Sequence, residues 1–537
     1  MIDPVGVSGN FFALNRAPAA NLGIGVISGI TRQGSYLDIA FTRLQWRPDF
    51  LRIVRGSVRR CLMQLHSRFR PFLILLSLAT ASCSTTWPEY ERPPLDLPAV
   101  PAEPAKPLSI DRQWWKAFED PALNALVDEA LLHNWDLAKA AANVAEAKAA
   151  VATAKSLLSP RVDGVINAGS SQRQLTLGKS EKEFDDVVST GAIGAAVSWE
   201  IDLWDRIRQM NDAALARFAA TEHARNATTL SISTLVADTW FQLRILDAKL
   251  VVTRAAAANL KSVTELEFRR WKAEVGTELA YIQSLAEFKA TEARVPVIEE
   301  AVSQTELALK LLVGRSPRAI GEPVPRPSLQ KRQGEDLPEG SMPTVPQTPR
   351  EVDSILLLRR PDVASAELLL VAAHADVNSA RAEFYPRLTL SLLAGFVAST
   401  SSAISGMPLF WEASAGLIGP IFDGGLVQSK VDSAEARQQK ALAHYQYTVS
   451  LAFREVYQSL VQMDAGDRQF KSIQEELTVR KRSIVLAEKS YDAGRTSKFE
   501  VLSETVKALN SALLLADARF NQLSARSQYY KALGGGF

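Results

Sequence analysis

The stretch Ala154-Lys155-Ser156-Leu157-Leu158-Ser159-Pro160-Arg161-Val162 returns 226 residues later as Ala380-Arg381-Ala382-Glu383-Phe384-Tyr385-Pro386-Arg387-Leu388. In both places a helix-favouring run meets a Pro-Arg pair. Further segments recur at a spacing of 220 residues: Trp271-Lys272-Ala273-Glu274 with Tyr491-Asp492-Ala493-Gly494, and Leu312-Val313-Gly314 with Ala532-Leu533-Gly534. A repeat of this length is too long for a solenoid unit, so the sequence predicts one structural unit built twice in tandem.

The composition argues against several classes of function. A net charge of +2 over 537 residues does not favour a nucleic-acid partner. The chain has two cysteines, no phosphate loop, no G-x-S-x-G elbow and no H-E-x-x-H motif. Its histidines lack metal-ligand spacing: His66, His133, His223, His374 and His444. We therefore expect no enzyme, no cofactor and no metal site.

A secretory signal peptide is predicted at residues 63–82. Residues 63–70 are short and basic, and residues 71–81 are uncharged and apolar. The apolar run is far shorter than the ~20 residues of a membrane-spanning helix. Because signals begin a chain, we expect residues 1–62 to be a non-native or leader extension. A genuine N-terminal extension is the alternative.

Cys83 directly follows the signal, where a bacterial lipoprotein carries its lipidated residue. Thr80 stands where such signals usually have Leu, and Ala79-Thr80-Ala81 would also suit ordinary cleavage. We predict lipidation, because a lone cysteine at this place is unusual in an exported chain without later cysteines. The Pro-rich residues 83–110 are expected to form a lipidated tether.

Period-two alternation predicts a β-hairpin at residues 161–167 and 197–203, with a loop at about 170–190. The second strand has a polar face with Glu200 and Asp202, and an apolar face with Trp199, Ile201 and Leu203. In a membrane barrel the polar face would line the lumen and the apolar face would contact lipid. Burial of the apolar face against helices of the same chain is the alternative.

Residues 205–275 contain neither proline nor glycine, so they predict one helix of roughly 105 Å. A rod of this length indicates coiled-coil-like packing. A turn and a return helix at 278–313 follow, with a kink at Pro296. We expect the first repeat at 111–314, a Pro-rich linker at 315–350 and the second repeat at 351–537. The second repeat should have strands at 388–392 and 412–422, separated by a loop at 398–411.

Four strands per chain are too few for a membrane barrel, and lipid does not tolerate open sheet edges. Three copies would supply twelve strands, which is an allowed number. The fold class expected is mainly α with a small β part, assembled as a homotrimer.

Several motifs occur in the same order as in one known family: Trp114-Trp115-x-x-Phe118-x-Asp120-Pro121-x-Leu123, Asn134-x-Asp136-Leu137, Arg359-Arg360-Pro361-Asp362-Val363-x-x-Ala366-Glu367, Tyr385-Pro386, Phe422-Asp423-Gly424-Gly425 and Tyr491-x-Ala493-Gly494. Over residues 84–537 the chain resembles the TolC-like outer-membrane efflux proteins, in particular their NodT-type lipoprotein branch. The resemblance implies a homotrimer with a 12-stranded transmembrane β-barrel, continued by a long α-helical barrel in the periplasm. It also implies a location in the outer membrane. The partners that it implies are a periplasmic adaptor (membrane fusion protein) and an inner-membrane transporter, expected to be of the RND type.

The resemblance further implies that the two helical turns form the periplasmic mouth, where a closed duct is constricted and the adaptor docks. The expected gate or adaptor contacts are Tyr491, Gly494, Arg495, Glu500, Trp271 and Gly276. Ser503 and Glu274 depart from the family, which often has an acidic residue at the first position and usually a glycine at the second. Alternatively, Tyr491 and Gly494 only shape the turn.

The function expected is therefore a passive exit duct for drugs or toxic compounds in a tripartite efflux system. Two alternatives remain, which are the duct of a type I protein secretion system and a periplasmic coiled-coil lipoprotein with a structural role. A scaffold has no need for strands that are apolar on one face, so the hairpins favour the duct.

Overall fold

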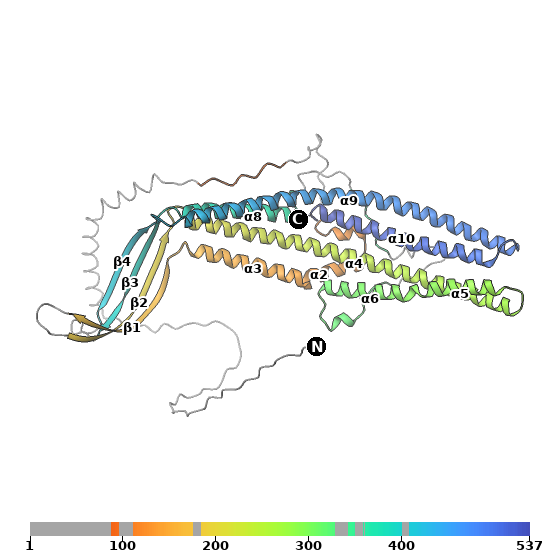
Figure 1. Cartoon of the computed structure of the whole chain (residues 1–537), viewed down its shortest axis with the longest axis horizontal. Helices are drawn as coiled ribbons and strands as arrows, with labels where there is room; N and C mark the ends of the chain where they lie inside the picture. Colours follow the sequence, from red (N-terminus) through yellow and green to blue (C-terminus); the bar gives the residue numbers. More distant parts are fainter. Residues whose placement is uncertain are drawn as a thin grey trace, which may run out of the picture. The chain divides into compact units, whose positions relative to one another are not determined.

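The computed structural model describes residues 87–95, 111–175, 184–327, 342–348, 358, 360–399 and 407–536 (Figure 1). All of them belong to the unit Ser84–Phe537. The extension 1–62, the signal 63–82 and Cys83 lie outside the described residues, as do most of the tether and the middle of the linker.

From α3 and α8 onward, the described elements follow the same order in both repeats. The first repeat contains η1 (Trp114–Phe118), α2 (Pro121–His133), α3 (Trp135–Ser156), β1 (Arg161–Leu175), β2 (Phe184–Ile201), α4 (Arg206–Lys272), α5 (Glu278–Glu292) and α6 (Arg294–Val313), and the linker adds η2 (Ala319–Gly321). The second contains α8 (Pro361–Ala382), β3 (Arg387–Ser399), β4 (Leu409–Ile418), α9 (Leu426–Asp492) and α10 (Lys498–Ala532). Helices α3 and α8 have 22 residues each, and α4 and α9 have 67 each. The two predicted repeats therefore correspond in the order and length of these elements.

The four strands form one antiparallel sheet in the order β1-β2-β3-β4. Strand β2 joins the two repeats, because Glu200 pairs with Thr389 and Val197 with Leu392. Strands β1 and β4 are the edges of this sheet within the described residues.

The predicted strand limits need correction. Strand β2 ends at Ile201, so Asp202 and Leu203 lie beyond it rather than on its two faces. The Asp202 carboxylate instead accepts hydrogen bonds from the backbone N–H groups of Ile207 and Arg208, at 3.1 and 2.8 Å. It thus satisfies amide donors at the start of α4, which helix geometry leaves without partners.

The predicted loops at 170–190 and 398–411 are too long, because the strands continue into their Gly- and Ser-containing ends. Backbone pairing does not require apolar side chains, and Gly169 pairs with Thr190 in the ladder. Strand β4 begins earlier than predicted, at Leu409, and ends at Ile418, two residues before Pro420. Proline lacks the N–H group that would continue the ladder.

The helix α4 is anchored by the first residues of the repeat. Phe118 packs on Phe241 with 4.8 Å between ring centroids, and both are fully buried. Trp240 donates its indole N–H to Asp120 Oδ2 at 2.8 Å, while Asp120 Oδ1 caps the start of α2. The Trp-Trp-x-x-Phe-x-Asp-Pro motif therefore fastens the first described residues of the repeat to α4 near Trp240 and Phe241.

In both repeats, a side chain at the start of the repeat donates a hydrogen bond to the last turn of the return helix. Asn134, before α3, donates from Nδ2 to the Leu312 carbonyl at 2.7 Å. Arg360, before α8, donates from Nη1 to the Ala532 carbonyl at 3.0 Å. Both carbonyls lie in the last turn of a return helix, so each bond ties the beginning of a repeat to its end.

The return helix of the first repeat is interrupted, as the sequence predicts. Helix α5 ends at Glu292 and α6 begins at Arg294. Pro296 lacks the N–H group that would bond to the carbonyl of residue 292, so the ladder breaks there. The second repeat has no proline at the corresponding place, and α10 is continuous.

Gly314→Ala and Gly494→Ala should destabilise the protein to different extents. Both glycines have positive φ, +82° and +69°. A Cβ at Gly494 meets nothing within 4 Å, so we expect a cost of about 1 kcal/mol from strain alone. A Cβ at Gly314 would overlap the His133 carbonyl oxygen, which raises the cost to about 3 kcal/mol. Thermal unfolding followed by circular dichroism measures both.

Gly321→Ala is the control for these two variants, because Gly321 has no positive φ and open space around its Cβ position. We expect it to change stability by less than about 0.5 kcal/mol. Equal losses at positions 314 and 494 would contradict the packing assigned to Gly314.

Candidate functional site: the paired helical turns

The turns after α4 and α9 have the same backbone geometry. The residue at the turn of the chain is Glu274 in the first repeat, with φ +62°, and Gly494 in the second, with φ +69°. The N–H of the next residue donates back to the helix in both: Val275 to Arg270 at 3.0 Å, and Arg495 to Ser490 at 2.8 Å. This pattern is a Schellman motif, which satisfies the last carbonyls of a helix. Glu274 therefore adopts the left-handed conformation that Gly494 adopts more easily.

A contact between Arg270 and Tyr491 brings the two turns together at one end of the long helices (Figure 1). The Arg270 guanidinium donates a hydrogen bond to the Tyr491 hydroxyl. The Lys498 ammonium lies 4.8 Å from the centroid of the same ring, so a second cation covers Tyr491. Tyr491 is among the predicted site residues, whereas Arg270 is not. The only signal for it was a basic residue beside Trp271.

Trp271 stands at the position of Tyr491 in the first repeat but has a different role. Its ring stacks on Tyr281 of α5, with 5.6 Å between centroids and an interplanar angle of 7°. Lys272 places its ammonium 4.3 Å from the Trp271 centroid. Trp271 therefore joins α4 to its own return helix, while Tyr491 joins the two repeats.

The remaining predicted residues shape or line the turns. A Cβ at Gly276 would lie 3.0 Å from the Arg270 Cβ, so glycine allows the chain to pass close to this residue. Arg495 and Glu500 are exposed, and no side-chain partner is found for either in the described part of the chain. Apolar side chains beside the first turn are exposed as well: Val275 at 68%, Leu279 at 65% and Ile282 at 48%. This surface can dock a partner.

The predicted strand residues lie where the sheet meets the helices. Glu200 forms an ion pair with Arg206, the first residue of α4, at 2.8 Å. Trp199 donates its indole N–H to the Leu158 carbonyl at 3.1 Å. Both side chains therefore tie β2 to neighbouring helix ends, and their exposure to lumen or lipid stays a prediction.

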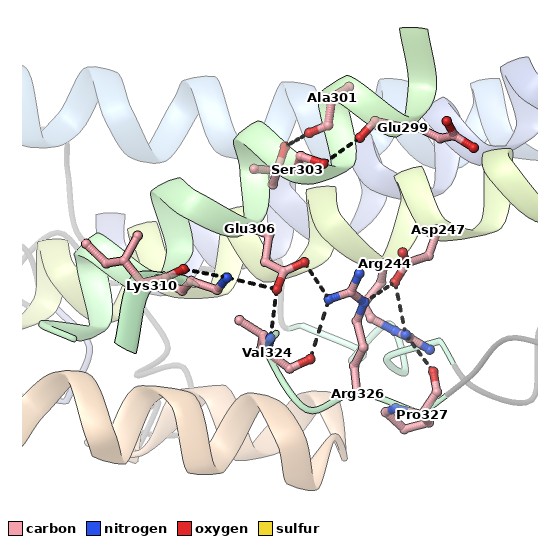
Figure 2. Close-up of polar contacts among 12 residues, drawn as sticks. Arg244, Asp247, Glu299, Ala301, Ser303, Glu306, Lys310, Val324, Arg326 and Pro327 are labelled. Atoms are coloured by element: carbon pink, nitrogen blue, oxygen red, sulfur yellow. Dashed lines mark hydrogen bonds and ion pairs between the residues drawn. The ribbon is translucent and has the colours of Figure 1, made fainter. Parts of the chain in front are cut away.

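A cluster that sequence reasoning missed fastens the linker to the helices (Figure 2). The Arg326 guanidinium lies 2.9 Å from Asp247 Oδ2 on α4 and 3.0 Å from Glu306 Oε2 on α6. Glu306 also accepts from the Val324 N–H at 2.7 Å and pairs with Lys310 at 3.1 Å. The fully buried Arg244 donates to the Pro327 carbonyl at 2.9 Å. We call Arg244, Asp247, Glu306, Lys310 and Arg326 the linker clamp.

The charges of the linker clamp depend on one another. Burial raises the pKa of Asp247, against the opposing effect of Arg326 and Arg244. Burial alone would also raise the pKa of Glu306. The Val324 N–H, Arg326 and Lys310 together outweigh it and hold that pKa below its usual value. Arg326 thus lies between two carboxylates and favours the ionised form of both.

Among the described residues, no group of three or more His, Cys, Asp or Glu side chains is arranged to hold a metal ion. None of the helices that the structure describes is both long and apolar enough to cross a membrane.

Comparison with known proteins identifies the family. The sequence profile described as "Outer membrane efflux protein" matches residues 126–315 and 353–535. The chain belongs to the outer membrane efflux protein family. The predicted family, its location in the outer membrane and the expected role as an outer-membrane efflux component are confirmed at this level. Such a component works with the other components of a pump.

Individual relatives cover nearly the same part of the chain. The pyoverdine export outer membrane protein OpmQ of Pseudomonas aeruginosa is 32% identical over 79% of this chain and 88% of its own length. The probable outer membrane lipoprotein SilC of Salmonella typhimurium is 27% identical over 87% and 99%. The crystal structure of the CmeC outer membrane channel of Campylobacter jejuni aligns with a TM-score of 0.73, at 25% identity, over 85% of this chain and 95% of CmeC.

Arg326→Met should destabilise this efflux protein by about 2 kcal/mol, because it leaves Asp247 and Glu306 without their shared cation. The defect should shrink at acid pH. The low pKa of Glu306 means that its stabilising contribution is present at neutral pH and is lost as the pH falls through that pKa. Arg318→Met is the control, since Arg318 is exposed and lies on the same linker. Thermal unfolding from pH 8 down to about pH 3 measures the difference, because the pKa of Glu306 lies below its usual value. Equal melting temperatures of the two variants at neutral pH would contradict the clamp.

Proposed function

We propose that the protein is the passive exit duct of a tripartite efflux system, assembled as a homotrimer. The observation that carries this proposal is the four-stranded sheet whose outer strands, β1 and β4, have no further strand beside them in the part of the chain that the structure describes. Such edges are not tolerated in lipid, and an isolated four-stranded sheet cannot close. Edge pairing between three copies would give a barrel of twelve strands. The long helices would continue this barrel as a helical tube.

In this arrangement Glu200 would face the lumen, while Trp199 and Ile201 would face lipid. Period-two alternation supports this assignment, because reversing the faces would expose a charged group to lipid. The duct would carry out no reaction and need no cofactor, since it only has to offer a passage.

We infer that the paired turns are the periplasmic mouth and the contact surface for a periplasmic adaptor. The first turn exposes Val275, Leu279 and Ile282, and the second exposes Arg495 and Glu500, so this end of the helices offers both apolar and charged side chains. An inner-membrane transporter, of the RND type, would deliver the cargo through that adaptor. The names of relatives support small molecules as cargo: OpmQ exports pyoverdine, and SrpC of Pseudomonas putida belongs to a solvent efflux pump.

We also propose that Cys83 is lipidated after removal of the signal 63–82, and that residues 83–110 tether the repeats 111–314 and 351–537 to the membrane. The position of this cysteine after an apolar run supports the assignment, as does the lipoprotein SilC among the relatives. Uptake of labelled palmitate by the unmutated protein and its loss in Cys83→Ser would test it.

The proposed duct should be recovered from outer-membrane fractions as a trimer that runs at higher apparent mass before heating than after it. Reconstituted into planar bilayers, the same material should conduct ions, because a closed barrel encloses water. A monomer released by osmotic shock would contradict the duct and favour a periplasmic scaffold.

Tyr491→Phe should open the proposed mouth more often. The change removes the hydroxyl that accepts from Arg270 and keeps the ring that Lys498 covers. A hydrogen bond to a charged group contributes about 1.5–3 kcal/mol, so the open probability should rise about tenfold or more. Single-channel recording measures it.

Tyr281→Phe is the matched control, because it makes the same chemical change on a ring whose described contacts are with the rings of Trp271 and Phe268 and do not need the hydroxyl. We expect its open probability to equal that of the unmutated protein. If Tyr491→Phe also conducts like the unmutated protein, Tyr491 only shapes the turn.

A further inference from the structure

The helices that directly precede the β-hairpin of each repeat, α3 and α8, are covered very differently. Helix α8 contacts both α4 and α9 and has many buried residues, including Leu370 and Val377. Helix α3 has the same length, contacts α4, and has no buried residue. One face of α3 therefore lacks the cover that the equivalent face of α8 receives from the other repeat.

The covered seam between the repeats consists of α4 and the return helix α10. Ile245 and Val252 of α4 lie in one buried cluster with Leu509 and Leu515 of α10. Asp238 of α4 accepts hydrogen bonds from Ser527 and Gln528 of α10. The residues that α4 contributes to this seam have counterparts on α9, 220 residues later in the chain.

We propose that the equivalent face of α9 is the subunit seam and receives the return helix α5–α6 of a second copy, with Glu300 of that copy as its charged anchor. This proposal rests on the proposed trimer. When a duplicated unit closes into a ring, the second repeat of one chain must meet the first repeat of the next. The contact of α4 with α10 is then repeated as a contact of α9 with α6.

A pair of hollows shows where the contact forms. In the first repeat, Asp238, Thr239 and Gln242 of α4 and Ala308 of α6 line a hollow that Phe520 of the other repeat closes. In the second repeat, the corresponding residues Gln458, Ser459, Gln462 and Gln528 line a hollow together with Arg454 and Lys531. Every described residue that lines this second hollow belongs to the second repeat itself, so the element that would correspond to Phe520 has to come from another copy.

The positive charges of the second hollow fit an acidic residue on α6 of another copy. The residue at the position of Phe520 in the first repeat is Glu300, which is exposed on α6. Arg454 and Lys531 have no ion pair within the described part of the chain, and the nearby Glu455 is paired with Arg360 at 2.6 Å. A carboxylate entering beside two cations and several amide groups gains charge-assisted hydrogen bonds.

The rest of the seam carries smaller or charged side chains where the seam within the chain is apolar. Ile245 and Val252 correspond to Ala465 and Ser472 on α9. Leu509 and Ala512 of α10 correspond to Lys289 and Glu292 on α5. The seam between subunits therefore depends on charge and is weakened by salt, whereas the seam within each chain depends on apolar burial.

Charge reversal tests the anchor in the full-length protein. Glu300→Lys should shorten the lifetime of the trimer at a fixed elevated temperature about tenfold, because it opposes like charges across the seam. Arg454→Glu should do the same, and the double variant should recover most of the lifetime. Glu287→Lys is the matched control, since its counterpart Lys507 keeps 49% of its side chain exposed and thus faces away from the seam within the chain.

Cysteine pairs provide a second measurement. Glu300→Cys combined with Gln458→Cys should be joined by a short bismaleimide into dimers and trimers, and neither single variant should be. A trimer that forms normally but shows neither charge-swap recovery nor cross-linking would overturn this seam and leave the duct intact. Absence of any trimer in the unmutated protein would instead contradict the proposed function itself.

Discussion

Every other feature of this protein depends on the length of α4 and α9. A helix of 67 residues extends about 100 Å, and no single small core can cover it. Such a helix is stable only if different elements cover it in turn along its length. On α4 these are α8 and α3 beyond the sheet, then η1 and α2 around Trp240, then α6, α10 and α5 towards the turn. The duplication supplies two of these partners, because α4 lies against α8 and α10 of the other repeat, whereas the main contacts of α9 are with α8 and α10 of its own repeat.

An acidic residue of the long helix is paired with a cation in both repeats, but the cation comes from a different place in each. In the second repeat, Asp467 of the long helix pairs directly with Arg526 of the return helix at 2.7 Å. The corresponding residues in the first repeat are Asp247 and Glu306, which repel each other. Arg326 of the linker lies between them and replaces the missing positive charge. The linker is therefore more than a spacer, since the first repeat needs it to hold its own helices together.

The helical spacing of apolar residues and the positions of proline and glycine were enough to predict the helices. Absence of proline and glycine located α4 within a few residues, and Pro296 located the break between α5 and α6. The strands were harder, because Gly169 and its serine neighbours pair through the backbone and carry no apolar pattern. Asp202 was assigned to a strand because it continues an alternation, although its carboxylate caps α4. The partners of Tyr491 and Asp247 could not be predicted, because Arg270 and Arg326 come from segments distant in sequence that only folding brings near.

The same turn geometry supports two different functions at positions 271 and 491. Both residues are aromatic, and both precede a left-handed residue that ends the helix. Trp271 stacks within its own hairpin, so its packing survives any movement of one repeat past the other. Tyr491 holds Arg270 of the other repeat by one hydrogen bond and a cation–π contact of 5.7 Å, whose energy is small compared with the buried apolar seam above it. The two repeats are therefore held together weakly at the turns and strongly further along the helices. Separation of the hairpins would begin at the turns and stop where the apolar packing begins.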